Sequence, residues 1–523
     1  IHREFLNSSG ATSYTNIMVK APEESENFFN KYDKNYETFE SAFINTLKKL
    51  NVCSQKGLVE RFDSSIGAGT VVMPFGGKYS LTPSQSMAAK IPMLEGETNA
   101  GTIMSYGYNP YIGEWSPFHG GLYAVIEAVA KIVASGGDYR KIRLSCQEYF
   151  EKLGENPEKW GKPFSALLGA LKVQTALDIP AIGGKDSMSG SFKELHVPPT
   201  LIAFGVNVVN VENVISPEFK GEGHKVVLIS LPRDKYYVPN FEALKKNYER
   251  INSLVNTEKI ISAYAVTGGG IVEAVSKMAF GNKVGVQFEK DSWINIENLL
   301  SPEYGSIVVE FNDEVKVEEE LKDISYKLLG ETTAESYFSI GDEKIDLDKL
   351  IQGWEAPLES VFKTKTEAIH MNIENIEYDS EVKRVSVLKN IKPEVFIPVF
   401  PGTNCEYDTS RAFQRVGAKS NIVVFKNNSI VDIEDSIEAM VKAINSCNIL
   451  MIPGGFSAGD EPDGSGKFIA TVFRNERIKE AAMNLLNKRD GLALGICNGF
   501  QALIKLGLVP YGEIREITED SPT

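Results

Sequence analysis

A cysteine at a sharp bend near the end of the chain is the residue best placed to do chemistry. Residues 491–503 (GLALGICNGFQAL) predict a buried strand, a tight turn and the start of a helix, with Cys497 at the turn. A helix start directs backbone N–H groups and the positive end of the helix dipole at the sulfur, which favours a nucleophilic thiolate. Gly495 and Gly499 remove side chains where the turn is tightest. Cys497 is therefore a candidate nucleophile, and an unreactive buried cysteine is the alternative.

Two upstream segments predict further loops of the same kind. Residues 399–406 (VFPGTNCE) and 450–460 (LMIPGGFSAGD) are apolar runs that end in polar, glycine-containing turns. Ligands of open α/β sheets lie at the carboxyl ends of strands, so we expect both loops to meet Cys497 at one pocket. Together the three motifs resemble the class I glutamine amidotransferase domain of the purine-pathway branch. The resemblance implies that Cys497 attacks the side-chain amide of glutamine.

The same resemblance implies which groups hold the substrate. Backbone N–H groups near Gly455 and Asn498 would hold the oxyanion that forms during the attack. The residues implied for oxyanion and glutamine binding are Gly454, Gly455, Phe456, Asn498 and Gly499.

The triad partners of the cysteine do not follow it in this sequence. A class I glutaminase needs a His to take the thiol proton and a carboxylate to orient that His, and in the family both follow the cysteine as H-x-E. All histidines precede Cys497, and they are His2, His119, His196, His224 and His370. Since the chain runs from Ile1 to Thr523, we expect a truncated or cleaved chain that lacks both partners.

Composition narrows the class of protein. A chain of 523 residues with 42% hydrophobic and 24% charged residues is typical of a soluble protein of about three domains, and no apolar run has the length of a membrane span. The net charge of −15 argues against broad nucleic-acid binding. Five widely spaced cysteines without a C-x-x-C pair indicate a reducing cytoplasm and no zinc site. We therefore expect neither a membrane nor a nucleic acid as partner.

Three glycine-rich segments in the middle of the chain are suited to phosphates. Residues 179–190 (IPAIGGKDSMSG) offer backbone donors, the Lys185 charge and the Asp186 carboxylate, although a solvated turn is the alternative. Residues 72–79 (VMPFGGKY) and 267–280 (TGGGIVEAVSKMAF) add two more glycine turns, and the second opens a helix. Helix N-termini behind such turns suit anions.

These segments, followed by the glutaminase motif, resemble the large single-chain form of the phosphoribosylformylglycinamidine synthase family over nearly the whole chain. In that family two halves, each built like aminoimidazole ribonucleotide synthetase, precede a fused glutaminase, and this chain matches the second half plus part of the glutaminase. The resemblance implies conversion of formylglycinamide ribonucleotide, ATP and glutamine to the amidine, with ATP and magnesium as cofactors and the missing first half as partner. A glutaminase that serves another ammonia-using ligase, or a mainly structural half, are the alternatives.

The resemblance also implies the fold, an α/β and α+β multidomain chain. A synthetase-like half, with an ATP-binding-like domain and a C-terminal α/β domain, would precede an incomplete flavodoxin-like glutaminase. A helix is expected at residues 119–133, where apolar residues recur at helical spacing. The expected parts are a remnant of the preceding synthase domain at 1–20, a helical linker at 21–56, the nucleotide-site domain at 57–215, the α/β domain at 222–362, a linker at 363–392 and the glutaminase at 393–523.

The sequence departs from its family where an auxiliary nucleotide with magnesium would bind. Family members use the patterns P-x-x-D-C-A-V, E-A-L-T-N and S-D-G-G, of which this chain retains Glu127 as the only metal ligand. The two Asp positions hold Ser86 and Gly268, and the Asn position holds Lys131. Magnesium needs oxygen ligands and an ammonium repels it, so we expect no magnesium in this site.

Lysines are expected to take the place of the ions. Lys131, with Lys78 and Lys185, would bind a metal-free nucleotide or form a salt-bridged pocket with Glu127 and Asp186. The site is then vestigial or occupied without metal. The expected nucleotide-site residues are Gly184, Lys185, Asp186, Ser187, Lys78, Ser86, Glu127, Lys131, Gly268 and Gly269.

Overall fold

The chain divides into two compact units. The computed structural model describes residues 2–3, 14–62, 64–65, 69–93, 96–365, 392–456, 466–518 and 521. Unit 1 lies within residues 1–93 and 97–370, and unit 2 lies within residues 94–96 and 371–523. None of the described helices combines the length and the apolar character that crossing a bilayer requires.

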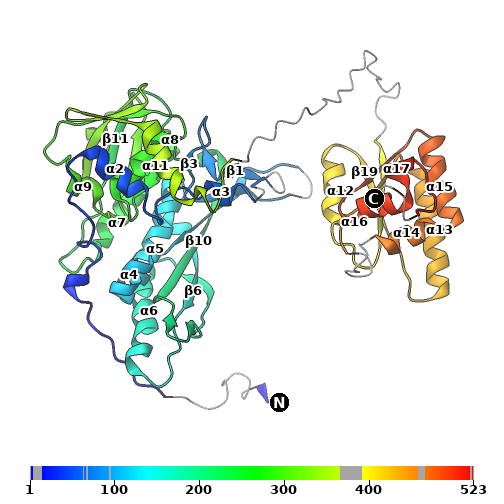
Figure 1. Cartoon of the computed structure of the whole chain (residues 1–523), viewed down its shortest axis with the longest axis horizontal. Helices are drawn as coiled ribbons and strands as arrows, with labels where there is room; N and C mark the ends of the chain where they lie inside the picture. Colours follow the sequence, from blue (N-terminus) through cyan, green and yellow to red (C-terminus); the bar gives the residue numbers. More distant parts are fainter. Residues whose placement is uncertain are drawn as a thin grey trace. The chain divides into compact units, whose positions relative to one another are not determined.

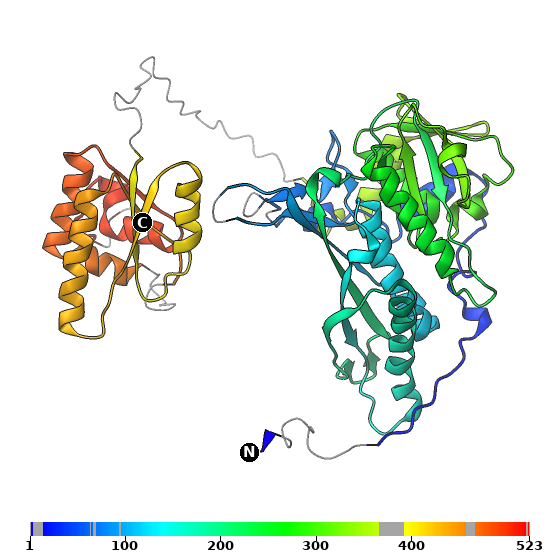
Figure 2. The same cartoon turned by 180° about the vertical axis from the view of Figure 1, so that it is seen from behind.

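The first sheet of unit 1 has six strands and carries two helices on one face. Only β6 and β7 are parallel neighbours, and the other neighbouring strands are antiparallel. Helices α5 (Pro117–Ala134) and α6 (Pro157–Leu177) pack against each other, and α5 packs along β10 (Figures 1 and 2). In spatial order the strands are β1 (Thr70–Val72), β4 (Met87–Lys90), β5 (Ala100–Gly107), β10 (Thr200–Asn210), β6 (Arg143–Tyr149) and β7 (Ala181–Lys185).

Helix α5 confirms the helix expected at residues 119–133 and begins two residues earlier. Ser116 caps it, because its hydroxyl accepts a hydrogen bond from the His119 backbone N–H, and Pro117 occupies the first turn. The sequence pattern predicted one apolar face, whereas the helix is buried almost all round. On one side it contacts β5 and β10 of the first sheet. On the other side it contacts helix α7 (Phe241–Asn256) and strand β12 (Ile260–Ala265), which belongs to the second sheet. Helix α5 therefore joins the two layers of unit 1.

The second sheet of unit 1 has seven strands and is buried on both faces. Along β11, Val227 and Ile229 enter the core shared with α5 and α7, while Val226 and Leu228 enter a second core with α8 (Gly270–Phe280). This alternation is the two-residue period of a strand. The spatial order is β12 (Ile260–Ala265), β14 (Ile307–Phe311), β11 (Lys225–Ile229), β15 (Tyr326–Thr333), β13 (Gly285–Phe288), β16 (Tyr337–Ile340) and β17 (Glu343–Asp346).

The segment expected as a helical linker at 21–56 contributes to the second core. It contains η1 (Glu24–Glu26) and α2 (Phe39–Leu47), and α2 packs against α8 and α11 (Leu347–Glu359). Phe43 and Leu47 of α2 are fully buried there. The described part of this segment is thus held in unit 1.

Two of the predicted parts are described only at their ends. Residues 1 and 4–13 of the expected remnant and residues 366–391 of the expected linker lie outside the described residues. The predicted domain boundaries therefore stay predictions.

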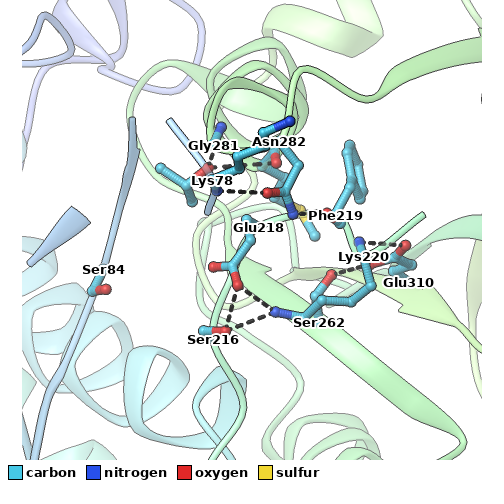
Figure 3. Close-up of polar contacts among 12 residues, drawn as sticks. Lys78, Ser84, Ser216, Glu218, Phe219, Lys220, Ser262, Gly281, Asn282 and Glu310 are labelled. Carbon is cyan, nitrogen blue, oxygen red and sulfur yellow. Dashed lines mark hydrogen bonds and ion pairs between the residues drawn. The ribbon is translucent and has the colours of Figure 1, made fainter. Parts of the chain in front are cut away.

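A polar cluster holds the segment that leads from the first sheet to the second (Figure 3). Glu310 on β14 is fully buried, and its carboxylate accepts hydrogen bonds from the Ser262 hydroxyl at 2.6 Å and from the Lys220 backbone N–H at 3.0 Å. The Lys220 ammonium lies 2.6 Å from the Glu218 carboxylate, which also accepts from Ser216 at 2.7 Å. The Glu310 side chain thus accepts the hydrogen bond of a backbone N–H in the connecting segment, which has no strand partner there.

Unit 2 is an α/β domain with a parallel four-stranded sheet. The strand order β19-β18-β20-β21 is the flavodoxin-like order, as predicted. Its bounds are β18 (Glu394–Val399), β19 (Lys419–Val424), β20 (Ile449–Ile452), β21 (Leu492–Gly495), α12 (Glu406–Arg415), α13 (Ile430–Ser446), α14 (Lys467–Phe473), α15 (Glu476–Asn487), α16 (Asn498–Leu506) and α17 (Leu508–Tyr511). Among the described strands, β21 pairs only with β20, and its residues Leu492 and Leu494 are exposed.

Candidate functional site

Cys497 lies at the elbow between β21 and α16. Its φ of 52° and ψ of −109° are strained for a residue with a side chain, and its side chain is exposed. A Cβ on Gly499 would lie 2.0 Å from the Ile452 carbonyl oxygen, and one on Gly495 would lie 2.6 Å from the Gly499 backbone. Both glycines are therefore required by close backbone approach. The predicted strand, turn and helix are present, but the strand is not buried as predicted, because Leu492 and Leu494 are exposed. Such an elbow presents the sulfur to a ligand.

The loops after β18 and β20 meet at the same elbow. A Cβ on Gly454 would lie 3.5 Å from the Cys497 Cβ and 3.8 Å from the Cys405 Sγ. The Asn404 backbone N–H lies 3.4 Å from the Gly454 carbonyl oxygen, which joins the two loops directly. The structure thus brings together the three segments that the sequence singled out.

The other residues implied for oxyanion and glutamine binding surround this point. Gly455 has a φ of 136°, and the Phe456 backbone N–H donates to the Gly402 carbonyl at 2.8 Å. The Phe456 ring is exposed, whereas Asn498 is buried and its Nδ2 lies 3.3 Å from the Gln501 Oε1. Residues 457–460 of the predicted loop lie outside the described residues.

Unit 1 contains a cavity of about 1010 Å³ lined by residues from both of its sheets. Met104 of β5 and Tyr264 of β12 are among these residues. Of the expected nucleotide-site residues, the structure places four in the lining, namely Ser86, Glu127, Lys131 and Gly268. The remaining six are not lining residues of this cavity, and they are Lys78, Gly184, Lys185, Asp186, Ser187 and Gly269.

A buried ion pair projects from α5 to the cavity wall. The Lys131 ammonium lies 2.6 Å from the Glu127 carboxylate, and both side chains are about nine-tenths buried. Lys131 also donates to the Tyr106 carbonyl at 2.9 Å, and Glu127 accepts from the Tyr108 backbone N–H at 3.2 Å. Burial raises the pKa of Glu127, and the neighbouring ammonium partly offsets the rise. The ion pair of Lys131 with Glu127 belongs to one of the two predicted alternatives, whereas Asp186, expected in the same pocket, does not line the cavity.

A second ion pair of the same design comes from α8, and the sequence analysis missed it. The Lys277 ammonium lies 2.6 Å from the Glu273 carboxylate, again four residues apart and buried. Glu273 also accepts hydrogen bonds from the Thr267 hydroxyl at 2.7 Å and from the Gly269 backbone N–H at 2.9 Å. The chain's own carboxylate therefore takes the place of an external anion at this glycine turn. The E-x-x-x-K spacing directly after the turn is the signal that could have revealed it.

The residues of this cavity do not fit a magnesium-bound nucleotide. Glu127 is engaged by an ammonium, Gly268 offers no side chain, and the Ser86 hydroxyl donates to the Lys131 carbonyl at 3.0 Å. The described residues contain no group of three or more His, Cys, Asp or Glu side chains that could hold a metal ion. The two carboxylates and two ammonium groups compensate each other's charge.

The Gly-Gly-Lys-Asp-Ser segment is not the turn that the sequence favoured. Gly184 and Lys185 belong to the exposed edge strand β7, which no helix directly follows. A Cβ on Gly184 would lie 2.3 Å from the Cys146 carbonyl oxygen, so the glycine allows a close approach to β6. Asp186 lies beside Glu148, and burial together with the Asp186 charge raises the pKa of Glu148 to about 7. A second carboxylate nearby disfavours an anionic ligand here.

Lys78 is held by its backbone at a turn outside the cavity lining. Its N–H donates to the Asn282 Oδ1 at 2.8 Å, and the Asn282 Nδ2 donates to the Phe219 carbonyl at 2.7 Å (Figure 3). The structure therefore does not bring Lys78, Lys131 and Lys185 to one place.

The geometry of unit 2 agrees with a comparison to protein families. Residues 392–523 match the model of the CobB/CobQ-like glutamine amidotransferase domain. Unit 2 is thus similar to glutamine amidotransferases, the class that the elbow and its loops predict.

Curated relatives extend the similarity to unit 1. The chain is 26% identical over 287 residues to phosphoribosylformylglycinamidine synthase subunit PurL of Picrophilus torridus, covering 51% of this chain and 38% of the relative. It is 22% identical over 357 residues to the PurL subunit of Methanobrevibacter smithii, covering 63% and 47%. The chain spans less than half the length of these relatives. The solved PurLQS structure from Thermotoga maritima aligns with a TM-score of 0.46 and 14% identity, over 66% of this chain and 56% of that one. The resemblance to phosphoribosylformylglycinamidine synthase that the motifs predicted is confirmed.

Removing one partner of the α8 ion pair should destabilise unit 1. Lys277→Met leaves the Glu273 carboxylate buried without an ammonium, so we expect a loss of about 3–5 kcal/mol in the free energy of unfolding. The double variant Glu273→Gln/Lys277→Met should recover most of it. Lys245→Met removes the exposed pair with Glu242 and should cost below about 1 kcal/mol. All four tryptophans belong to unit 1, so urea unfolding followed by their fluorescence reports this unit. Equal losses for Lys277→Met and Lys245→Met would contradict the role given to the pair.

Glu148 should make the stability of unit 1 depend on pH. Its folded pKa of about 7 lies above the ordinary 4.5, so the contribution is fully present below about pH 4.5 and is lost as pH rises through 7. Glu148→Gln should therefore lose less stability than the unaltered chain between about pH 5 and about pH 8. The exposed Glu155→Gln serves as control, and tryptophan-monitored unfolding measures all three proteins. Parallel pH profiles for the Glu148 variant and the unaltered chain would refute the assignment.

Proposed function

We propose that this chain is part of an ATP-dependent, glutamine-hydrolysing phosphoribosylformylglycinamidine synthase. The observation that carries the proposal is Cys497, exposed on a strand-to-helix elbow within a domain that matches glutamine amidotransferases. The whole enzyme would convert formylglycinamide ribonucleotide, ATP and glutamine to formylglycinamidine ribonucleotide, ADP, phosphate and glutamate. The names of the curated relatives support this substrate set over that of another ammonia-using ligase.

The chemistry of unit 2 would begin at the Cys497 sulfur. Its thiolate attacks the carboxamide carbon of glutamine, and the oxyanion that forms is held by backbone N–H groups near Gly455 and Asn498. Ammonia leaves, a glutamyl thioester remains on Cys497, and water then releases glutamate. The proton that the thiol gives up is transferred to the departing nitrogen, which therefore leaves as ammonia. The ammonia would displace phosphate from a substrate activated by ATP in the synthase.

Unit 1 would serve this enzyme as its auxiliary half. The two buried ion pairs, Glu127 with Lys131 and Glu273 with Lys277, favour a largely structural role for its cavity and a nucleotide site that is vestigial or free of metal. The other synthase half of the enzyme would then bind the reacting ATP with magnesium. A cytoplasmic location is part of the same proposal.

Replacement of the nucleophile should separate the two half-reactions. In the full-length protein, Cys497→Ala should abolish glutamine-dependent amidine formation and leave the ammonia-dependent reaction within about twofold, because only glutamine hydrolysis needs the thiol. Both activities are measured as amidine formed with either nitrogen donor, and Cys146→Ala serves as the control that should retain both. Loss of the ammonia-dependent reaction in Cys497→Ala would place the cysteine in the synthase site or in the fold.

Calorimetry tests the auxiliary cavity. Titration of this chain with ADP should give the same weak or absent binding with and without magnesium, because the positions of the metal ligands hold Ser86, Lys131 and Gly268. An ADP affinity that rises at least tenfold on adding magnesium would overturn the proposal for unit 1 and leave that for Cys497 untouched.

A further inference from the structure

Two exposed thiols lie beside the candidate glutaminase site. Cys497 occupies the elbow before α16, and Cys405 immediately precedes α12; both are free and exposed. Both cysteines lie next to Gly454. A Cβ built on this glycine would be 3.5 Å from the Cys497 Cβ and 3.8 Å from the Cys405 Sγ. Because Gly454 has no side chain, no side-chain atom of this residue lies between the two cysteines.

The backbone holds the two thiols near each other. The Phe456 N–H donates to the Gly402 carbonyl at 2.8 Å, and Thr403 pairs with Gly455 in an isolated bridge. These contacts join the loop that carries Cys405 to the loop beside Cys497. These backbone contacts fix the two loops relative to each other, whereas the position of the Cys405 sulfur also depends on its rotamer.

Unit 2 has three cysteines, and their environments separate Cys405 and Cys497 from Cys447. Among the described residues, the Cys405 thiol donates to its neighbour Asn404, whose Oδ1 lies 3.1 Å away, and breaking this weak hydrogen bond lets the side chain rotate. Cys447 is buried, and burial raises the pKa of its thiol, which lowers the fraction of thiolate. Cys405 is thus the cysteine of this unit positioned to react with Cys497.

We propose that Cys405 is a resolving thiol for Cys497, and that peroxide converts the two to a reversible disulfide that switches off the use of glutamine. The Cys497 thiolate attacks one peroxide oxygen, the O–O bond breaks, and the departing hydroxide takes a proton to become water. Cys497 is then a sulfenic acid, oxidised by two electrons, while the peroxide is reduced.

The second step forms the bond between the residues. The Cys405 sulfur attacks the Cys497 sulfur, the S–O bond breaks, and the hydroxide leaves as water with the proton of the Cys405 thiol. A disulfide needs Cβ atoms about 3.5–4.5 Å apart, so movement of the loop must bring the two Cβ atoms to this distance while rotation about each Cα–Cβ bond turns the sulfur atoms towards each other. Gly402 in the Cys405 loop has a φ of 90°, and a glycine can adopt other backbone conformations at little steric cost. A thiol reductant reverses the step and restores the nucleophile.

Mass spectrometry of the full chain tests the pair. After treatment with equimolar hydrogen peroxide and alkylation of free thiols, non-reducing peptide mapping should find a peptide with Cys405 linked to Cys497, which dithiothreitol abolishes. Cys405→Ser should give no linked peptide and should instead accumulate sulfinic acid on Cys497, at least fivefold above the unaltered chain. Cys447→Ser, the matched control within unit 2, should retain the link.

Two results would overturn the proposal. One is oxidation of Cys497 in the unaltered chain without a linked peptide, and the other is equal recovery of free Cys497 by dithiothreitol in the Cys405→Ser variant. The proposal relies on the proposed function only for the consequence of the disulfide, because the readout is a mass and needs no turnover. A linked peptide in a protein that uses no glutamine would retain the thiol pair and refute the glutaminase role.

Discussion

Compensation of buried charge is the interaction on which the layered structure of unit 1 depends. Helices α5 and α8 each place a lysine in the wall of a cavity between two sheets, and each supplies a glutamate four residues earlier. An unpaired buried ammonium at such a position would cost several kcal/mol, which is comparable to the net free energy of unfolding of a whole domain. With the charges matched on the same helix, each ammonium has a carboxylate partner in the wall of the cavity.

Unit 2 depends on a different constraint, the approach of backbone to backbone. The elbow at Cys497 exists because Gly495 and Gly499 let the start of α16 lie against β20 and β21, closer than any side chain would permit. The chemistry of the site follows from this packing, since the strained turn both exposes the sulfur and directs a helix start towards it. Structure and reactivity share the same few residues.

Sequence alone predicted the features that depend on local spacing. The strand, turn and helix around Cys497 and the helix α5 follow from patterns a few residues long, and the structure has them where they were expected. Contacts between residues of different elements, such as strand pairing, were harder to predict. Gly183 and Gly184 satisfy the pattern of a phosphate turn equally well, but pairing with β6 makes them part of a strand. The spacing of Glu273 and Lys277 indicates an ion pair, whereas the hydrogen bond from the Gly269 N–H to the Glu273 carboxylate is apparent only in the folded structure.

The one-sided pairing of β21 has a practical consequence. Among the described strands it bonds only to β20, and it carries Leu492 and Leu494 exposed beside a row of backbone groups without a strand partner on its other side. The unpaired edge of an exposed apolar strand can pair with a further strand. The open side of β21 is therefore where a further strand would extend the parallel sheet of unit 2.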